Sequence, residues 1–509
     1  MLTERRVAAP HETATTLAEF ARRPVYLVAG AMALLMLLTS GRYGYFGDEL
    51  YFIAAGHHLD WGYADQPPLV PLLAATMDTL FPGSLVALRL PSILLTALGV
   101  IVTALITREL GGERRAQIIA AIASASSPFL LACAGHWMAT QTLDPFLWAV
   151  ISWLVVRWVR TRDDNNLLLA GIFTAITLQG KLLIPVFWLA VGVSLLIVGP
   201  SEMLRRKKLW IGAAITVVSA IPTLLWQASN GWPQLEMQRA ISAEQAGAGG
   251  RLAFVPAVLV MAGLVAGSVL LVYGLWRLLW SDELRAYRFF GLAAIGIGVF
   301  FVVSFGRPYY VAGIFAICWA AGAVELQRQT HSRWWTWLVS RPVWALSAAV
   351  AVSFLPLNPL TVQETRLYNP INLPKAELGW PQLAETTAKA YRALPPDEKR
   401  HTVVMANNYW EAGALEHFGP EYGLEEPIYS PHRGYWYFGG PPTTTSTVLF
   451  AGGTPETVRK YFGSVRKLAT VDNEIVVDNN RLGPPIWLCE QPRKPWRQLW
   501  PEMREFTFR

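Results

Sequence analysis

The chain has 509 residues, of which 53% are hydrophobic and only 16% are charged, and its formal net charge is +7. Soluble proteins carry about a quarter of their residues as Asp, Glu, Lys and Arg, so this composition excludes an ordinary soluble enzyme and predicts a polytopic membrane protein. The basic excess does not indicate nucleic-acid binding, because Arg and Lys form short clusters between apolar runs, the pattern that orients membrane helices.

Residues 1–23 are polar and end in Arg22-Arg23, and no small-residue cleavage site follows the next apolar run. We therefore expect a cytoplasmic N-terminal tail and a retained first helix instead of a removed signal peptide. The next part, residues 24–356, is expected to be the transmembrane domain. Judged against the roughly 20 apolar residues that cross a bilayer, it contains about eleven candidate spans: 24–40, 84–106, 116–133, 145–160, 166–179, 183–199, 209–227, 253–277, 289–305, 311–325 and 336–356.

Basic clusters fall on alternate connections between these spans. With a cytoplasmic N-terminus, the cytoplasmic loops hold Arg108, Arg114 and Arg115, then Arg157, Arg160 and Arg162, then Arg205, Arg206, Lys207 and Lys208, then Arg277, Arg285 and Arg288, then Arg328 and Arg333. The other loops hold only isolated basic residues. Because positive charge marks the cytoplasmic side, we expect residues 41–83, the turn before Asp144, the 228–252 loop and residues 357–509 to lie outside the cytoplasm.

Residues 357–509 differ from the rest in their frequent charges, prolines and glycines. Strand-like runs at 402–405, 447–450 and 474–477 alternate with helical patterns near 410–418 and 454–462. This alternation predicts an extracytoplasmic α/β domain.

The three cysteines, Cys133, Cys318 and Cys489, have no metal or redox spacing. We expect them to be small buried apolar residues.

The first loop, residues 41–83, is too long for a plain connector, and its apolar portions, 50–53 and 69–81, are too short to span a membrane. They suit helices that lie along the membrane interface.

This loop carries three acidic residues, Asp48, Glu49 and Asp65. Carboxylates at the mouth of a membrane segment are costly and usually mark chemistry or ion handling. The alternative is that Asp48 only caps a helix, since Asp before an apolar run is a common N-cap. That alternative leaves Glu49 and Asp65 without a role.

Another acid, Asp144, is predicted at the start of a helix whose Pro145 suits the first turn. Capping alone is an equally good explanation of Asp144. Because Asp48 and Asp144 are expected at the same membrane face, they can also share a site and divide base and binding duties.

The only cofactor that the side chains suggest is a divalent metal ion. Its ligands would come from Asp48, Glu49, His57, His58, His136 and Asp144. The spacing of these residues has no metal signature, so the question of a metal stays open.

Short motifs along the chain resemble, in their order, the bacterial membrane glycosyltransferases of the C superfamily that are related to protein O-mannosyltransferases and lipid A aminoarabinose transferases. They are Phe46-Gly47-Asp48-Glu49-Leu50-Tyr51-Phe52, Asp65-Gln66-Pro67-Pro68-Leu69, Leu88-Arg89-Leu90-Pro91-Ser92, Thr142-Leu143-Asp144-Pro145, Gln179-Gly180-Lys181 and Gly306-Arg307-Pro308-Tyr309-Tyr310. The C-terminal domain, with residues 408–414, looks like the one found in part of that family. Gln66 stands where relatives often have histidine, which weakens any histidine role there.

The resemblance implies an integral membrane glycosyltransferase that moves a hexosyl or pentosyl group from a polyprenyl-phosphate donor. The acceptor would be a protein, glycan or lipid on the outer face of the cytoplasmic membrane. Transfer would invert the sugar, with Asp48 as the general base. The implied catalytic residues are Asp48, Glu49 and Asp144, and the implied substrate-binding residues are Lys181, Arg307, Tyr309, Tyr310, Asp65 and His136.

Lys181 and Arg307 are expected at helix ends, where two cations can hold a leaving phosphate. Each can instead reach up to lipid headgroups, and Tyr309 and Tyr310 suit interface anchors better than catalytic groups. Membrane lipids are expected partners, and nucleic acid is not.

Two other functions fit parts of the pattern. A transporter or lipid flippase would use Asp48 and Glu49 as ion or proton sites, but the chain shows no pair of related halves with matching interrupted helices. A scaffold or receptor explains the C-terminal domain but not the carboxylate-rich loop. Turnover of a polyprenyl-phosphate sugar without an ion gradient separates the enzyme from the transporter.

Overall fold

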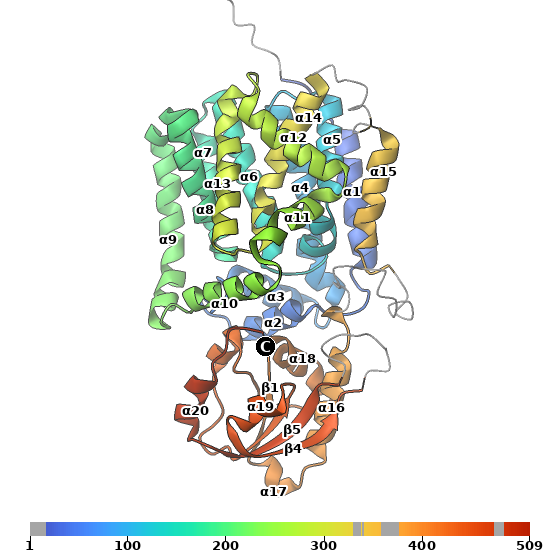
Figure 1. Ribbon diagram of the computed structural model, residues 1–509, viewed down its shortest axis with the longest axis vertical. Coiled ribbons are helices and arrows are strands. Elements are labelled where there is room, and N and C mark those ends of the chain that lie inside the picture. The colour runs from blue at the N-terminus through green and yellow to red at the C-terminus, as the bar shows by residue number, and fades with distance from the viewer. Residues whose placement is uncertain (1–16, 329–336, 338–339, 358–375, 473–482, 509) are drawn as a thin grey trace, which may run out of the picture.

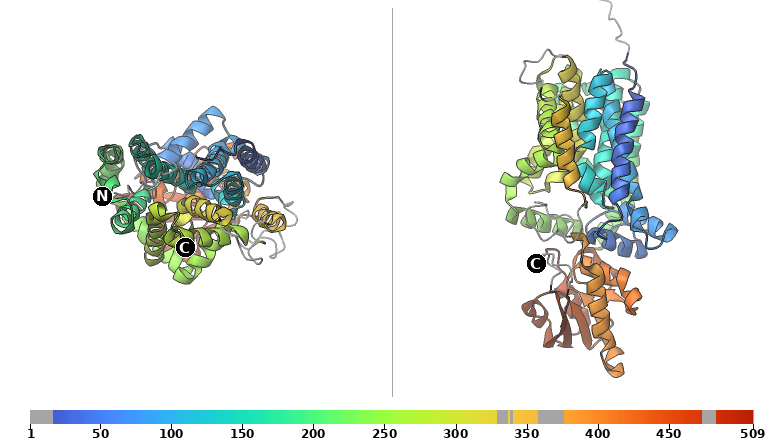
Figure 2. Two further views of the ribbon diagram at one scale, coloured as in Figure 1. Left: turned by 90° about the horizontal axis from the view of Figure 1, so that it is seen from above. Right: turned by 90° about the vertical axis from the view of Figure 1, so that its right-hand side faces the viewer.

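The computed structural model describes residues 17–328, 337, 340–357, 376–472 and 483–508. A bundle of long helices stands on a smaller α/β domain formed by the C-terminal part of the chain (Figure 1). The side view of Figure 2 shows the same stacking along the long axis of the molecule. The predicted fold class, a helical multi-pass membrane protein with a C-terminal α/β domain, is confirmed.

The bundle contains α1 (Arg22–Thr39), α4 (Leu85–Glu109), α5 (Arg114–Ala125), α6 (Thr140–Thr161), α7 (Asn165–Gly180), α8 (Ile184–Val198), α9 (Lys207–Ser229), α11 (Gly250–Gly263), α12 (Ala266–Trp280), α13 (Arg288–Val303), α14 (Phe315–Arg328) and α15 (Arg341–Ser353). Short connecting pieces are a π-helical turn, Leu130–Ala134, and 3-10 helices at Ser201–Arg205, Arg285–Tyr287 and Pro308–Ile314. Among the described residues, six helices are long and apolar enough to cross a membrane, or up to seven if one bent helix pair counts as a span.

One predicted span, 253–277, is wrong as a continuous helix. The chain leaves the helix between α11 and α12, because Gly263 and Val265 have φ values of 120° and 71°, which an α-helix cannot accommodate. The other predicted spans overlap helices of the bundle, although residues 336, 338 and 339 of the last one lie outside the described residues. The N-terminal residues 1–16 lie outside them too.

Basic residues of the predicted cytoplasmic clusters meet at the end of the bundle away from the α/β domain. Arg160 Nε lies 2.5 Å from Glu109 Oε2, and Glu325 lies 2.6 Å from Arg277 and 3.3 Å from Arg328. These ion pairs join α4 to α6 and α12 to α14. Their common position agrees with the charge pattern in the sequence.

Three helices lie across the other end of the bundle, between it and the α/β domain: α2 (Gly47–His57), α3 (Leu69–Leu80) and α10 (Pro233–Gly247) (Figure 1). Both portions of the first loop that were predicted to lie along the interface are therefore helical, within α2 and α3. With 11 and 12 residues, these helices are too short to cross a bilayer.

The α/β domain consists of α16 (Trp380–Arg392), α17 (Pro396–Lys399), β1 (Thr402–Ala406), α18 (Tyr409–Phe418), β2 (Ile428–Tyr429), β3 (Thr447–Ala451), α19 (Pro455–Arg459), β4 (Phe462–Thr470), β5 (Pro485–Pro492) and α20 (Trp496–Met503), with 3-10 helices at Gly419–Tyr422 and Arg433–Phe438. The strand order is β2-β1-β3-β5-β4. The first three strands are parallel, and β5 runs antiparallel to β3 and β4.

The sheet is covered on both faces. Apolar side chains of α16 and α18 share one core with the sheet and with α2, whereas α19 and α20 share a second core with it. The predicted strands at 402–405 and 447–450 and the helix at 410–418 are confirmed. The helix predicted to 462 ends at Arg459, because β4 begins at Phe462, and the predicted strand at 474–477 lies outside the described residues. Cys318 and Cys489 are buried and Cys133 is partly buried, and all three are free.

Two glycines allow α2 and α18 to touch through their backbones. A Cβ on Gly413 would lie 2.9 Å from the carbonyl carbon of Leu50 and 3.0 Å from the amide nitrogen of Tyr51. A Cβ on Gly47 would overlap the ring of Trp410. Residues with side chains at these two positions would force the helices apart, so the seating of the α/β domain on the first loop depends on them.

We predict that Gly413→Ala lowers the stability of the protein by about 1 to 3 kcal/mol, because the new methyl group meets backbone atoms that cannot turn away. Thermal unfolding in detergent measures this loss. Gly192→Ala is the control, since a Cβ at Gly192 in α8 would meet no atom within 4 Å. Equal melting temperatures for the two variants would contradict the predicted contact.

Candidate active site

A cavity of about 270 Å³ lies where the bundle, the first loop, α10 and the α/β domain meet. Six of the nine predicted site residues line it, and three do not. Its charged and aromatic lining comprises Asp48, Asp65, Lys181, Arg307, Tyr309, Tyr310, Tyr51, Phe52, Tyr409 and Arg433.

Asp48 lies in the first turn of α2, which begins at Gly47. It does not cap this helix: Glu49 Oε2, not Asp48, accepts the backbone N–H of Phe46 at 2.8 Å. Asp48 Oδ1 instead accepts hydrogen bonds from Tyr409 Oη and Trp410 Nε1, both at 2.7 Å. Its carboxylate therefore faces the cavity and the α/β domain.

Asp65 follows α2 in the first loop and lines the same cavity. The hydroxyl of Tyr51 donates a 2.8 Å hydrogen bond to Asp65 Oδ1. Desolvation raises the pKa of Asp65 to about 6, although this hydrogen bond and the nearby Arg433 charge both act to lower the pKa. The site thus holds a second carboxyl that changes charge in the mildly acidic range.

The cations Lys181 and Arg307 enter the cavity from the bundle. Lys181 Nζ lies over the rings of Tyr309 and Tyr310, 4.7 and 4.5 Å from their centroids, and 3.4 Å from Thr140 Oγ1. Among the described residues, no carboxylate forms an ion pair with Lys181. The predicted alternative, in which Lys181 reaches lipid headgroups, does not describe this position.

Arg307 immediately precedes the 3-10 helix Pro308–Ile314, which carries Tyr309 and Tyr310. Its Nη2 lies 3.3 Å from Glu244 Oε2, and its buried Nε has no hydrogen-bond partner in the described part of the chain. A buried N–H without a partner is costly unless a ligand accepts from it.

Glu244 of α10 links Arg307 to a third cation, Arg433 of the α/β domain. The Glu244 Oε1 to Arg433 Nη2 distance is 2.5 Å. The sequence alone did not indicate a site role for Glu244 or Arg433. No motif marks them, and each acquires its role only when α10 and the C-terminal domain come together.

Amide side chains form another part of the lining: Gln66, Gln141, Gln234 and Gln238. Within the described residues, two of their buried atoms, Gln66 Nε2 and Gln234 Oε1, have no hydrogen-bond partner. One donor and one acceptor of residues that line the cavity are thus without a partner in that part of the chain.

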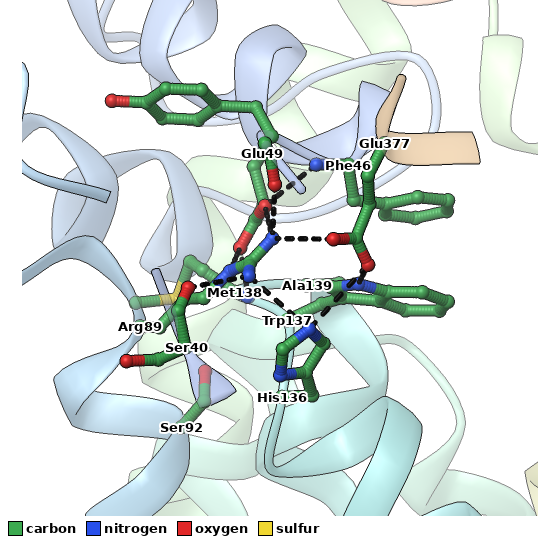
Figure 3. Close-up of polar contacts among 12 residues, drawn as sticks. Ser40, Phe46, Glu49, Arg89, Ser92, His136, Trp137, Met138, Ala139 and Glu377 are labelled. Atoms are coloured by element: carbon green, nitrogen blue, oxygen red, sulfur yellow. Dashed lines mark hydrogen bonds and ion pairs between the residues drawn. The ribbon is translucent and has the colours of Figure 1, made fainter. Parts of the chain in front are cut away.

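Glu49 and His136, both predicted in the site, belong instead to a buried ionic cluster centred on Arg89 of α4 (Figure 3). Arg89 Nε and Nη2 donate to the two oxygens of Glu49 at 2.9 and 2.7 Å, a bidentate pair. Arg89 Nη1 lies 3.2 Å from His136 Nε2. Because consecutive helical residues point about 100° apart, Glu49 turns inward where Asp48 turns to the cavity.

The same cluster includes Glu377, which lies shortly before α16 of the α/β domain. Its carboxylate lies 3.8 Å from Arg89 and 3.5 Å from His136, and it accepts the indole N–H of Trp137 at 2.7 Å (Figure 3). Arg89, Glu49, Glu377 and His136 are all almost completely buried. An arginine in an apolar helix indicates a buried partner. The Leu88-Arg89-Leu90-Pro91-Ser92 motif therefore contained a signal for a buried ion pair of Arg89.

The expectation that Asp144 starts a helix is wrong. The helix α6 begins earlier, at Thr140, so Pro145 lies inside it. Thr142 causes the earlier start, because its hydroxyl accepts the N–H of Ala139 at 3.3 Å and donates to the carbonyl of Trp137 at 2.8 Å. Asp144 does not line the cavity, and among the described residues its buried Oδ1 has no hydrogen-bond partner.

The six residues considered as metal ligands are divided among separate places. His57 lies 3.1 Å from Glu416 and 3.7 Å from Asp78, and His58 stacks on Phe438. Across the described ranges, no three His, Cys, Asp or Glu side chains gather as a metal site. The arrangement therefore does not fit the suggested metal.

Comparison with known proteins supports a transferase fold. Residues 65–226 match the family model described as dolichyl-phosphate-mannose-protein mannosyltransferase. This stretch begins at Asp65 and includes Arg89, Asp144 and Lys181. Comparison with curated proteins gives no match.

Solved membrane glycosyltransferases share the fold. ArnT from Cupriavidus metallidurans bound to undecaprenyl phosphate has a TM-score of 0.59 at 16% identity, covering 91% of this chain and 97% of ArnT. Its apo form has a TM-score of 0.55 with the same coverage. The archaeal oligosaccharyltransferase AglB from Archaeoglobus fulgidus, in complex with an inhibitory peptide and a dolichol-phosphate, gives 0.50 at 13% identity, covering 79% of this chain and 64% of AglB. The likeness in fold, together with the family-model match over residues 65–226, agrees with the resemblance found in the sequence.

We predict that Arg89→Met lowers stability by about 3 to 5 kcal/mol, because Glu49 and Glu377 stay buried without the cation that they share. Thermal unfolding in detergent measures the loss. Arg162→Met is the control: Arg162 pairs with Glu202 at 2.8 Å, but both side chains are nearly half exposed, so the expected loss is below about 1 kcal/mol. An Arg89→Met protein as stable as this control would show that the cluster contributes little.

Proposed function

We propose that this protein transfers a sugar from a polyprenyl-phosphate donor to an acceptor, with Asp48 as the general base. One observation carries the proposal: a single cavity holds the carboxylate of Asp48 together with two cations, Lys181 and Arg307. A displacement at an anomeric carbon needs these two groups, a base for the acceptor and positive charge for the departing phosphate.

Lys181 and Arg307 are suited to the phosphate. Lys181 is not neutralised by a carboxylate within 4 Å in the described chain, and Arg307 has a buried Nε–H that lacks an acceptor. Charge-assisted hydrogen bonds to phosphate are among the strongest available to side chains. The donor phosphate is expected to lie between these cations, beside Tyr309 and Tyr310.

An apolar cavity of about 360 Å³ suits the lipid tail of the donor. It is lined almost entirely by aliphatic side chains of α11, α12 and α13 together with Val311 and Ile314. These two residues lie on the same 3-10 helix as Tyr309 and Tyr310, next to Arg307. One short helix thus joins the proposed phosphate site to a surface that a polyprenyl chain can cover.

The proposed reaction is one displacement with inversion. Asp48 takes the proton of the acceptor nucleophile, the nucleophile forms a bond to the anomeric carbon, and the bond from that carbon to the phosphate oxygen breaks. The electron pair leaves with the polyprenyl phosphate, whose negative charge Lys181 and Arg307 stabilise. Whether the sugar is a hexose or a pentose, this balance is the same.

The free amide atoms of Gln66 and Gln234 favour a sugar substrate over a transported ion. A sugar hydroxyl both donates and accepts, so sugar hydroxyls can satisfy the Gln66 donor and the Gln234 acceptor. A proton or metal ion leaves the Gln66 donor unsatisfied. The transporter alternative therefore explains less of the lining.

The proposed location is the outer face of the cytoplasmic membrane. Basic residues concentrate at the opposite end of the bundle, where Arg160, Arg277 and Arg328 are paired. The cavity and the α/β domain lie at the other end (Figure 1). A lipid-linked donor reaches such a cavity from the membrane, and acceptors can be proteins, glycans or lipids outside the cell.

We predict that Asp48→Asn lowers turnover by about two to four orders of magnitude, the usual contribution of a positioned base. Asparagine still accepts the bonds of Tyr409 and Trp410 through its oxygen, but it cannot take the proton. The assay follows transfer from radiolabelled polyprenyl-phosphate hexoses and pentoses to a membrane extract, in detergent and without an ion gradient.

Asp60→Asn is the matched control, because Asp60 lies in the same loop and bonds Trp226 Nε1 at 2.6 Å, away from the cavity. Stability and binding of undecaprenyl phosphate should change little in Asp48→Asn. Near-normal transfer by Asp48→Asn, or loss of transfer only because it no longer folds, would remove Asp48 as the base.

We predict that Arg307→Gln weakens binding of undecaprenyl phosphate or slows transfer by about 1 to 3 kcal/mol, the contribution of a hydrogen bond to a charged group. Arg307→Lys keeps the charge but loses the planar fork, so it should restore only part of the loss. Thermal stabilisation of the protein by undecaprenyl phosphate measures the change in binding. Because this ligand carries no sugar, the measurement does not depend on which sugar the donor holds.

Arg251→Gln is the control for the loss of one positive charge at this end of the bundle. Arg251 stacks on Phe305, with 4.4 Å from its guanidinium carbon to the ring centroid, and does not line the cavity. Equal binding by the Arg307 and Arg251 variants would leave Arg307 without a role in phosphate recognition.

A further inference from the structure

The α/β domain contacts the proposed base directly. Tyr409 Oη and Trp410 Nε1, consecutive residues at the start of α18, both donate to the same oxygen, Asp48 Oδ1, at 2.7 Å. In the part of the chain that the structure describes, Asp48 Oδ2 accepts no hydrogen bond. One carboxylate oxygen is thus held by two donors, and the other is left for a ligand.

We propose that Tyr409 and Trp410 are positioning residues that hold Asp48 so that Oδ2 takes the acceptor proton. This inference rests on the proposed role of Asp48 as the base. Two short bonds from a phenol and an indole fix the carboxylate plane, because each donor is itself anchored on one helix. Without them the side chain can rotate, and a base misplaced by about 1 Å can lose a hundredfold in rate.

The direction of the Tyr409 hydrogen bond is set by Arg433. Arg433 Nη1 donates to Tyr409 Oη at 3.3 Å, and a guanidinium cannot accept a proton in return. Among the residues that the structure describes, the acceptor left for the Tyr409 hydroxyl proton is therefore Asp48. Burial and the neighbouring Asp48 charge raise the pKa of Tyr409 well above its ordinary value, which keeps the hydroxyl a donor.

Arg433 is itself held from both sides. Its Nη2 lies 2.5 Å from Glu244 Oε1 of α10, and its Nε donates to the backbone carbonyl of Phe506 at 2.9 Å. The chain of contacts from Glu244 through Arg433 and Tyr409 to Asp48 joins three separate parts of the molecule. Such a chain keeps the base in one orientation only when all three parts are assembled.

The alternative is that these bonds merely fasten the domain to the bundle. The domain is already fastened elsewhere: Trp380 Nε1 donates to the carbonyl of Tyr45 at 2.9 Å, His57 lies 3.1 Å from Glu416, and the glycine contacts of α18 pack on α2. Fastening the domain does not explain why two donors meet on one oxygen of a cavity carboxylate. A role in positioning that carboxylate does explain it.

Tyr409→Phe and Trp410→Phe test the proposal in the full-length protein. We expect each to lower kcat about 10- to 100-fold, while the KM for the polyprenyl-phosphate sugar and the binding of undecaprenyl phosphate stay within about twofold. In an Asp48→Asn background, neither substitution should lower the residual rate further, because no base remains to be oriented. A purely structural role would lower stability in both backgrounds and would not separate kcat from KM.

Tyr435→Phe and Trp436→Phe are matched controls in the same domain. The Tyr435 hydroxyl bonds Glu416, and Trp436 Nε1 donates to the carbonyl of Trp500 at 2.9 Å, so neither touches Asp48. Both should keep the kcat of the unaltered protein. If Trp410→Phe does not fold, Tyr409→Phe decides alone, since it removes only one oxygen atom.

The outcomes separate this inference from the proposed function. If Asp48→Asn is impaired while Tyr409→Phe and Trp410→Phe keep normal kcat, Asp48 remains the base and the positioning role is wrong. If Asp48→Asn itself transfers sugar normally, the base assignment is wrong and the positioning role falls with it.

Discussion

The crossing of α2 and α18 is the contact on which the site depends. Gly47 and Gly413 let the two helices approach until backbone atoms and the Trp410 ring touch. This approach brings Asp48 within hydrogen-bond distance of Tyr409 and Trp410. A carboxylate of the membrane part and two donors of the α/β domain thus form one unit, and the domain becomes part of the cavity wall.

The Arg89 cluster supports this crossing from within the bundle. Arg89 binds Glu49, the neighbour of Asp48, and also approaches Glu377, which leads into the α/β domain (Figure 3). Removing charges from water is costly, and only a complete set of partners offsets that cost. The cluster therefore favours one placement of α2 relative to both α4 and the domain, and so one placement of Asp48.

Charged side chains of both signs line the cavity. Glu244 pairs with Arg433 and with Arg307, so it offsets part of their positive charge. Lys181 instead lies among tyrosine rings and keeps its full charge. Asp48 and Asp65 lie on the side of the first loop. The proposed phosphate site includes Lys181, whereas the proposed base, Asp48, comes from the first loop, so the two groups that the proposed displacement needs come from different parts of the chain.

The sequence by itself determined the membrane class, the positions of most helices, the α/β domain and six residues of the cavity. The membrane class and the helix positions follow from local rules, because a bilayer demands apolar runs of fixed length and basic residues mark one side, whereas the cavity residues were implied by the resemblance of short motifs to a known family. It placed Glu49 in the site beside Asp48, and it missed Glu244, Arg433 and the ionic cluster around Arg89. Only the tertiary structure decided these contacts, because each depends on a distant partner: Tyr409 lies 361 residues from Asp48, and no local pattern encodes which of two adjacent carboxylates meets it.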